Sequence, residues 1–218
     1  MPLSSAASDT PAPRASPWTA LIIILASVCV LGGAVLGGWY FASSLDTSPP
    51  FRLTALASRP RAPDFHLVDS DNWPRTLADF RGKIVLIFFG YTHCPEACPT
   101  ELFKLAQVMR RLGEARSRVQ VLLITLDPER DTPQLLKGYV GAFDPGFIGL
   151  TGTPAQVDKV ATDYHVVYYK EKYGAEYLID HSTYTYIIDG KGDQRLLARM
   201  DASVDDLASD LKRLANTQ

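Results

Sequence analysis

The chain has 218 residues, with 22 Lys and Arg against 24 Asp and Glu, so its formal net charge is −2. This balance excludes a nucleic-acid-binding protein that works through a strongly basic surface. Hydrophobic residues make up 46% and aromatic residues 10% of the chain, which excludes wholesale disorder. Three cysteines are too few for a disulfide scaffold and fit a four-cysteine zinc site poorly, so their positions are what matters.

The first 62 residues predict a tail, a membrane anchor and a linker. Residues 1–17 are rich in Ser, Ala and Pro and predict a disordered tail. Residues 18–42 carry no charge, and a helix of this length crosses a bilayer once. A cleaved signal peptide is the alternative, because Ala42-Ser43-Ser44 could be a cleavage region, but the apolar run is longer than a signal-peptide core. Residues 43–62 are Pro-rich and predict an extended linker.

The sequence predicts the side of the membrane on which the domain lies less directly than it predicts the anchor. The positive-inside rule compares Arg14 and the free amino terminus with three arginines beyond the anchor, and this comparison does not favour a cytoplasmic tail. The tail is nevertheless short enough to stay in the cytoplasm, and the cysteine pair of the domain favours a place outside the cytoplasm. The tail also lacks a basic transit peptide, which favours a bacterium over a mitochondrion. We therefore expect a single-pass protein of a bacterial inner membrane, with its carboxy-terminal domain in the periplasm.

Residues 63–218 alternate strand and helix signals, which predicts one α/β domain. In chain order the pattern predicts a hairpin over 65–68 and 75–77, a buried strand over 83–89, a helix over 99–112, a buried strand over 119–125, helices over 132–142 and 153–164, a strand over 184–188 and a closing helix over 203–214. A βαβ start followed by further strands and helices is typical of a central mixed sheet flanked by helices.

Cys94 and Cys98 lie where the first buried strand passes into the first helix of the domain. Open α/β sheets place their ligand sites at the carboxyl ends of strands. A helix amino terminus lowers thiol pKa values, and a spacing of four puts both sulfurs on one side of a helical turn. A structural disulfide or two buried thiols would be the simpler interpretation, but an exposed corner is a poor place for either. The pair therefore predicts a soft-metal site or a redox exchange.

A third ligand would distinguish these possibilities, and His181 is the best of the four histidines. It directly precedes the strand predicted over 184–188, so its loop should reach the sheet edge at which the cysteines lie. A hydrogen-bonded loop histidine is an equally good interpretation of the spacing alone. Asp180 could hold the other ring nitrogen or supply local negative charge. His66 and His165 are more simply explained as polar surface or core-edge residues. His93 directly precedes Cys94, and the side chains of neighbouring positions often diverge, so it is a weaker candidate than His181.

Three motifs together resemble the Sco/SenC family: Phe88 to Pro99 around the cysteines, Asp127-Pro128-Glu129-Arg130-Asp131-Thr132, and Asp180-His181-Ser182. The resemblance covers roughly Ala62 to Leu211 and includes the single anchor. It implies a thioredoxin-like fold that binds one copper ion, as Cu(I) or Cu(II), through Cys94, Cys98 and His181. Many members have Asp where Glu96 stands, which retains the charge. It also implies that Asp127 lies near the copper site.

The same resemblance implies a metallochaperone rather than an enzyme. Family members deliver copper to the binuclear copper site of cytochrome c oxidase subunit II, or keep the cysteines of that site reduced. A second copper chaperone or a thiol reductase would be a further partner. Residues 168–174 correspond to a variable loop of the family, whose mobility would let His181 swing onto the metal. Oxidation of Cys94 and Cys98 to a disulfide would destroy the copper site.

Three other classes of protein fit the sequence less well. A thiol:disulfide oxidoreductase of thioredoxin type needs a cis-proline opposite its cysteines, but no proline follows Pro154 and the Asp180–Ser182 motif fills that place. A peroxidase would need one peroxidatic cysteine with an activating arginine, which a Cys-x3-Cys pair does not suggest. A passive membrane-tethered interaction domain would not need Cys94, Cys98 and His181 together. Cys29, inside the anchor, is most simply a small apolar residue.

Overall fold

The computed structural model describes residues 17–44, 50–174 and 176–217. The chain divides into two compact units, Met1–Pro50 and Phe51–Gln218, and each is described by itself. The predicted tail lies outside the described residues, apart from its last position.

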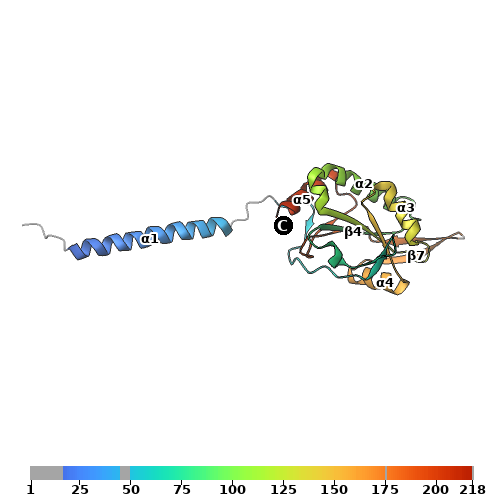
Figure 1. The fold of residues 1–218 in the computed structure, drawn as a ribbon, viewed down its shortest axis with the longest axis horizontal. Helices are drawn as coiled ribbons and strands as arrows, with labels where there is room; N and C mark the ends of the chain where they lie inside the picture. The colour runs from blue at the N-terminus through green and yellow to red at the C-terminus, as the bar shows by residue number, and fades with distance from the viewer. Residues whose placement is uncertain (1–16, 45–49, 175, 218) are drawn as a thin grey trace, which may run out of the picture. The chain divides into compact units, whose positions relative to one another are not determined.

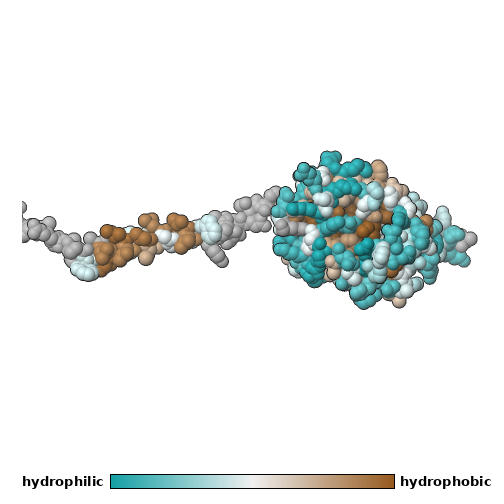
Figure 2. Space-filling model, viewed as in Figure 1, coloured by the Kyte–Doolittle hydropathy of each residue, from teal (hydrophilic) through white to brown (hydrophobic). Residues whose placement is uncertain are grey.

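One long helix makes up the described part of the first unit. This helix, α1 (Pro17–Ser44), includes all residues of the predicted anchor. Its segment Leu21–Trp39, of 19 residues, is long and apolar enough to cross a membrane. Figure 2 shows α1 as an almost continuous hydrophobic rod, in contrast to the largely hydrophilic surface of the second unit. A signal sequence near the amino terminus passes the same test of length and hydropathy, so α1 is a candidate span on those two grounds.

The second unit is built on a mixed eight-stranded sheet in the order β1-β10-β9-β4-β5-β6-β2-β3. Its parallel centre pairs β4 with β5 and β5 with β6, and every other pairing is antiparallel. The strands are β1 (Thr54–Ala55), β2 (Leu67–Asp69), β3 (Pro74–Arg75), β4 (Ile84–Gly90), β5 (Val119–Thr125), β6 (Ile148–Thr151), β9 (Thr185–Ile188) and β10 (Gln194–Ala198).

Helices cover both faces of this sheet. Figure 1 shows α2, α3 and α5 above the sheet and α4 below it. Their bounds are α2 (Ala97–Leu112), α3 (Pro133–Phe143), α4 (Pro154–Asp163) and α5 (Val204–Asn216), with short 3-10 helices η1 (Leu77–Phe80) and η2 (Gly113–Arg118). The predicted fold class, a central mixed sheet flanked by helices, is confirmed.

The core lies around β4 and β5, in which every residue is buried. Central parallel strands are covered on both faces, and this is why their sequences are continuous apolar runs rather than alternating ones. Each fully buried Leu, Ile or Phe of these strands stabilises the fold by about 1.5–3 kcal/mol. This rigid centre carries the carboxyl end of β4 and therefore the segment that contains the cysteines.

The predicted linker, residues 43–62, extends too far into the chain. The second unit already begins at Phe51, and β1 pairs with β10 at the edge of the sheet. Asp210 of α5 accepts hydrogen bonds from the backbone N–H groups of Arg52 and Leu53, both at 2.8 Å. These bonds join two segments more than 150 residues apart, a pairing that the local Pro-rich composition does not reveal.

The segment before His181 is also different from the prediction. The sequence predicts a loop over residues 168–174 and another loop around His181, but the structure has a hairpin of β7 (Tyr168–Tyr173) and β8 (Glu176–His181). This two-stranded sheet has no buried face along most of its length, so the alternation that predicts a strand is missing. Strands β6 and β10 were missed as well, whereas the other main elements lie within two or three residues of their predicted bounds.

Candidate metal centre

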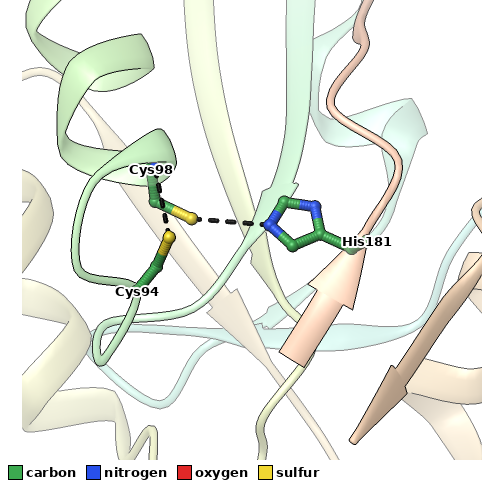
Figure 3. A group of neighbouring side chains, drawn as sticks. All are labelled: Cys94, Cys98 and His181. Carbon is green, nitrogen blue, oxygen red and sulfur yellow. Dashed lines mark hydrogen bonds between the residues drawn. The ribbon is translucent and has the colours of Figure 1, made fainter. Parts of the chain in front are cut away.

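Cys94, Cys98 and His181 converge at the carboxyl edge of the sheet (Figure 3). Cys94 lies in the loop after β4, Cys98 is the second residue of α2, and His181 is the last residue of β8. One ligand atom from each residue lies within 4.8 Å of the other two, and Cys98 Sγ is 3.6 Å from His181 Nε2. The structure therefore brings together the three residues that the resemblance implied as ligands, although 83 residues separate Cys98 from His181.

The two thiols have opposite environments. Cys98 is fully buried, whereas Cys94 is half-buried and borders a hollow of about 440 Å³. The pKa of Cys94 is lowered, to about 4, first because Cys98 hydrogen-bonds to its sulfur, and further through His181 and the backbone N–H groups of Cys98 and Glu96, against the opposing effect of burial. Hydrogen bonding to Cys94, burial and the charge of Cys94 raise the pKa of Cys98. The metal-free pair therefore carries one negative charge, on Cys94.

We expect iodoacetamide to alkylate Cys94 at nearly the same rate at pH 6 and pH 8 in metal-free reduced protein. The thiolate is the nucleophile, and a pKa lowered from 9.0 to about 4 leaves Cys94 ionised across this range. Cys98 should stay unmodified because it is buried and protonated. Peptide mass spectrometry at timed intervals measures both rates. A rate at Cys94 that rises about tenfold per pH unit would contradict the prediction, since that is the behaviour of an ordinary thiol.

Gly90, the last residue of β4, leaves the space that Cys98 occupies. A Cβ atom at this position would lie 2.8 Å from Cys98 Sγ and 3.1 Å from a ring carbon of Phe88. Real Cβ atoms essentially never approach another atom to less than 3.0 Å, so any larger residue would displace the Cys98 sulfur and crowd the Phe88 ring. The requirement for glycine here is thus a matter of space beside the sulfur.

We expect Gly90→Ala to weaken metal binding while leaving all three ligands in the chain. The added methyl should shift Cys98 Sγ and destabilise the domain by about 1–3 kcal/mol, the usual cost of overpacking a core. Gly141→Ala is the matched control: a Cβ there meets nothing within 4 Å, and alanine favours the helix α3. Chemical denaturation and metal titration of both variants test this. Equal behaviour of the two variants would show that the space beside Cys98 is not needed.

Three neighbours fix the ring of His181. The rings of Phe88 and Tyr91 meet it edge-on, each with centroids 6.2 Å away. Nδ1 lies 3.0 Å from the carbonyl oxygen of Ser182, so an Nδ1–H group donates to that carbonyl. In a neutral imidazole this leaves the lone pair on Nε2, which points at the sulfurs (Figure 3).

Asp180 does not hold the position at Nδ1 that the sequence suggested for it. The carbonyl of Ser182 takes that position, whereas Asp180 lies opposite Tyr169, its cross-strand partner in the hairpin, and its negative charge raises the pKa of the Tyr169 hydroxyl. Successive side chains of a strand point to opposite faces, so Asp180 and His181 face different ways. Asp180 still borders the same hollow as Cys94, where its contribution is local negative charge.

Asp127 lies next to the hairpin rather than next to the sulfurs. Its buried carboxylate accepts a hydrogen bond from the Tyr177 hydroxyl at 2.7 Å and forms a short ion pair with Arg130. The Arg130 guanidinium in turn stacks 3.7 Å from the centroid of the Tyr177 ring and donates to the Tyr177 carbonyl at 3.2 Å. We call these three residues, Asp127, Arg130 and Tyr177, the hairpin clamp. It joins the loop after β5 to the strand that ends at His181.

Two other buried polar residues position the site and were not identified from the sequence. Asp131 accepts hydrogen bonds from the backbone N–H of Thr92 at 3.0 Å and from its hydroxyl at 2.6 Å, which fixes the loop before Cys94. The Tyr91 hydroxyl accepts the backbone N–H of Ile179 at 3.0 Å, which ties β8 to the end of β4. Both residues stand in quoted motifs, but neither motif shows which way a side chain points.

The other histidines lie apart from the cluster. His93 Nδ1 is 3.0 Å from the Thr92 hydroxyl and 3.8 Å from Asp131 Oδ1. His66 and His165 are exposed and border a separate hollow beside α4. Among the described residues, the only group of three or more His, Cys, Asp or Glu side chains with metal-binding spacing is Cys94, Cys98 and His181.

Comparison with known proteins agrees with this picture. A family model described as SCO1/SenC matches residues 54–216. The protein named "Protein SCO2 homolog, mitochondrial" of Danio rerio is 35% identical over 195 residues, which cover 84% of this chain and 68% of that protein. The human protein of the same name is 44% identical over 133 residues, 59% of this chain and only 50% of the relative.

Solved structures match about three quarters of this chain over almost their own full length. ScoI of Bradyrhizobium japonicum, solved with copper bound, is 39% identical with a TM-score of 0.66, and the match covers 71% of this chain and 99% of that one. Apo Sco1 of Thermus thermophilus is 38% identical with a TM-score of 0.70, over 77% and 99% of the two chains.

The fold and the cluster define a thioredoxin-like domain with a Cys-Cys-His candidate metal site at the edge of its sheet, so the predicted fold is confirmed. The chain belongs to the SCO1/SenC family, because the family model spans three quarters of it.

Proposed function

We propose that this protein is a membrane-anchored copper chaperone that binds one copper ion through Cys94, Cys98 and His181. It would pass the ion to the binuclear copper site of cytochrome c oxidase subunit II during oxidase assembly. The observation that carries the proposal is the convergence of two sulfurs and one imidazole nitrogen within 4.8 Å. Its family membership and the copper-bound structure of a 39% identical relative support it.

The donor set suits copper better than a hard cation. Thiolates are soft ligands that favour Cu(I), and an imidazole binds either copper oxidation state. Three ligands leave the ion under-coordinated, and the hollow of about 440 Å³ beside Cys94 gives an incoming ligand access to it. Binding requires the Cys98 thiol to lose its proton, so each copper captured releases about one proton from the pair.

Delivery would proceed by ligand exchange rather than turnover. A target thiolate enters the hollow, binds the ion beside Cys94, and replaces the ligands of this chain one at a time. Cys94 is the accessible end of the site and Cys98 the buried end, so the geometry favours exchange that begins on the Cys94 side. The ion is thus never released into water.

A thiol:disulfide exchange role on the same partner is the second candidate, and the lowered pKa of Cys94 favours it. The Cys94 thiolate would attack a disulfide of the partner, forming a mixed disulfide and expelling one partner thiolate. Cys98, once deprotonated, would then attack the Cys94 sulfur and expel the second. The partner ends as a dithiol and gains two electrons, Cys94 and Cys98 end as a disulfide, and a thiol reductant must restore the pair.

Titration of the reduced full chain in detergent with Cu(I), against a chromophoric Cu(I) chelator, tests the proposal. We expect the protein to bind one equivalent of Cu(I) tightly. We expect His181→Ala to lower the Cu(I) affinity at least about tenfold, because the loss of a residue that only holds a metal ligand in place already lowers metal affinity about 10–100-fold. His93→Ala is the matched control, since that ring faces Asp131 instead.

Reduction of insulin disulfides is measured on the same proteins. Brisk reduction together with copper affinity that does not depend on His181 would favour the exchange role and contradict the copper proposal.

We further propose that α1 anchors the protein as a single-pass span of a bacterial inner membrane, with the second unit in the periplasm. A redox-active pair and a copper cargo both fit a compartment outside the cytoplasm. Protease treatment of spheroplasts should degrade the second unit, whereas intact cells should protect it. Protection in spheroplasts would place the domain on the cytoplasmic side.

A further inference from the structure

Met200 lies on the wall of the metal site, although no motif includes it. It lines the hollow of about 440 Å³ together with Cys94 and His181, and it also lines a second hollow of about 340 Å³ that His181 borders. Its side chain is half-buried. Met200 therefore stands at the boundary between the two hollows that meet at the imidazole.

The backbone of Met200 is tethered to the helix that carries Cys98. The Lys104 ammonium donates to the Met200 carbonyl at 2.7 Å and pairs with the buried Glu101 carboxylate at 2.7 Å. Glu101 in turn accepts the hydroxyl of Thr185 at 2.9 Å. The main chain at Met200 is thus held to the first turns of α2, and only the side chain is left to move.

The thioether is the right chemistry for the ion proposed here. Methionine sulfur is a soft donor that selects Cu(I), whereas imidazole serves both oxidation states. A methionine side chain has three rotatable bonds, so its sulfur can reach several positions from a fixed backbone. A purely packing role would be served equally by leucine, which has no donor atom.

We propose that the thioether of Met200 is an auxiliary Cu(I) ligand that binds the ion in place of His181 when the imidazole leaves it. This inference rests on the copper site proposed above. It gives the site two forms: Cys94, Cys98 and His181 hold either oxidation state, and Cys94, Cys98 and Met200 hold Cu(I) alone. The second form would retain the ion during ligand exchange with the target.

A double-variant cycle on the full chain in detergent tests this, with Cu(I) affinity measured by chelator competition. Met200→Leu should lower the affinity less than about threefold when His181 is present, and at least about tenfold in a His181→Ala chain, because substitutions that share one ligand position are not additive. Met109→Leu, a change of the same kind at a buried residue of α2, should have no effect in either chain.

Selenomethionine-labelled protein gives a second readout that does not depend on affinity. X-ray absorption of the Cu(I)-loaded His181→Ala chain should show selenium as a direct neighbour of copper, and Met200→Leu should remove that signal while Met109→Leu retains it. If the His181→Ala chain binds Cu(I) and its affinity does not change when Met200 is also replaced, this inference is overturned. It is also overturned if the bound copper has no selenium neighbour. Either result leaves the copper proposal intact. No Cu(I) binding by His181→Ala also overturns it, and no binding by the parent overturns both.

Discussion

Cys98→Ser is expected to lower the Cu(I) affinity at least about a hundredfold. Loss of a residue that only hydrogen-bonds to a metal ligand lowers metal affinity by up to about a hundredfold, and loss of the ligand itself should lower it no less. The serine hydroxyl is a hard donor that stays protonated at neutral pH, so it cannot replace a thiolate. Cys98 is fully buried, so the substitution removes the sulfur at the closed end of the site. Chelator competition with the reduced full chain measures the loss.

Cys29→Ser is the matched control, because it makes the same chemical change in the same chain. Cys29 lies in α1, in the first unit, and should not affect Cu(I) affinity. Cys94→Ser should resemble Cys98→Ser in copper affinity, and it should also abolish the fast alkylation expected near neutral pH. Cu(I) affinity that survives both Cys94→Ser and Cys98→Ser would contradict the assigned ligands.

The sequence predicted the parts of this site that depend on local patterns. A continuous apolar run predicted β4, and the cysteines four residues apart after it predicted a paired thiol site at a helix start. These features are local, since the strand, the turn and the first helical turn all lie between Ile84 and Thr100. The convergence of His181 on that turn depended on the family resemblance, because nothing in the spacing alone distinguishes a ligand from a hydrogen-bonded loop histidine.

The surroundings of the ligands could not be predicted in the same way. The β7–β8 hairpin has no buried face to leave a pattern, yet it determines where His181 lies. Asp180 was assigned to the imidazole because it is adjacent in sequence, but adjacency in a strand places it on the opposite face. Asp131 acts through hydrogen bonds to Thr92, 39 residues away in the chain. Packing, rather than composition, decides which of the polar residues reach the site.

The hairpin clamp gives the largest expected effect on stability. Asp127→Asn should destabilise the domain by about 3 kcal/mol, because it leaves the mostly buried Arg130 guanidinium without its buried counter-charge and with only the exposed Glu176 carboxylate, 3.8 Å away. Burial opposes the charge of Arg130, but the hydrogen bond and charge of Asp127 outweigh it and raise the pKa of Arg130. Tyr177→Phe should cost only about 1 kcal/mol, the value of one hydrogen bond. Urea denaturation measures both.

The clamp also predicts a loss of copper affinity without contact between its residues and the ion. Tyr177 lies four residues before His181 on the same strand, so a loosened hairpin lets the imidazole move away from the sulfurs. Asp127→Asn should therefore weaken Cu(II) binding, which needs the imidazole, more than Cu(I) binding, which the two sulfurs retain. Glu129→Gln is the control, because Glu129 pairs with Lys170 of the same hairpin at an exposed position and should cost less than about 1 kcal/mol. Equal losses for Cu(I) and Cu(II) would mean that the clamp supports the whole domain rather than the position of His181.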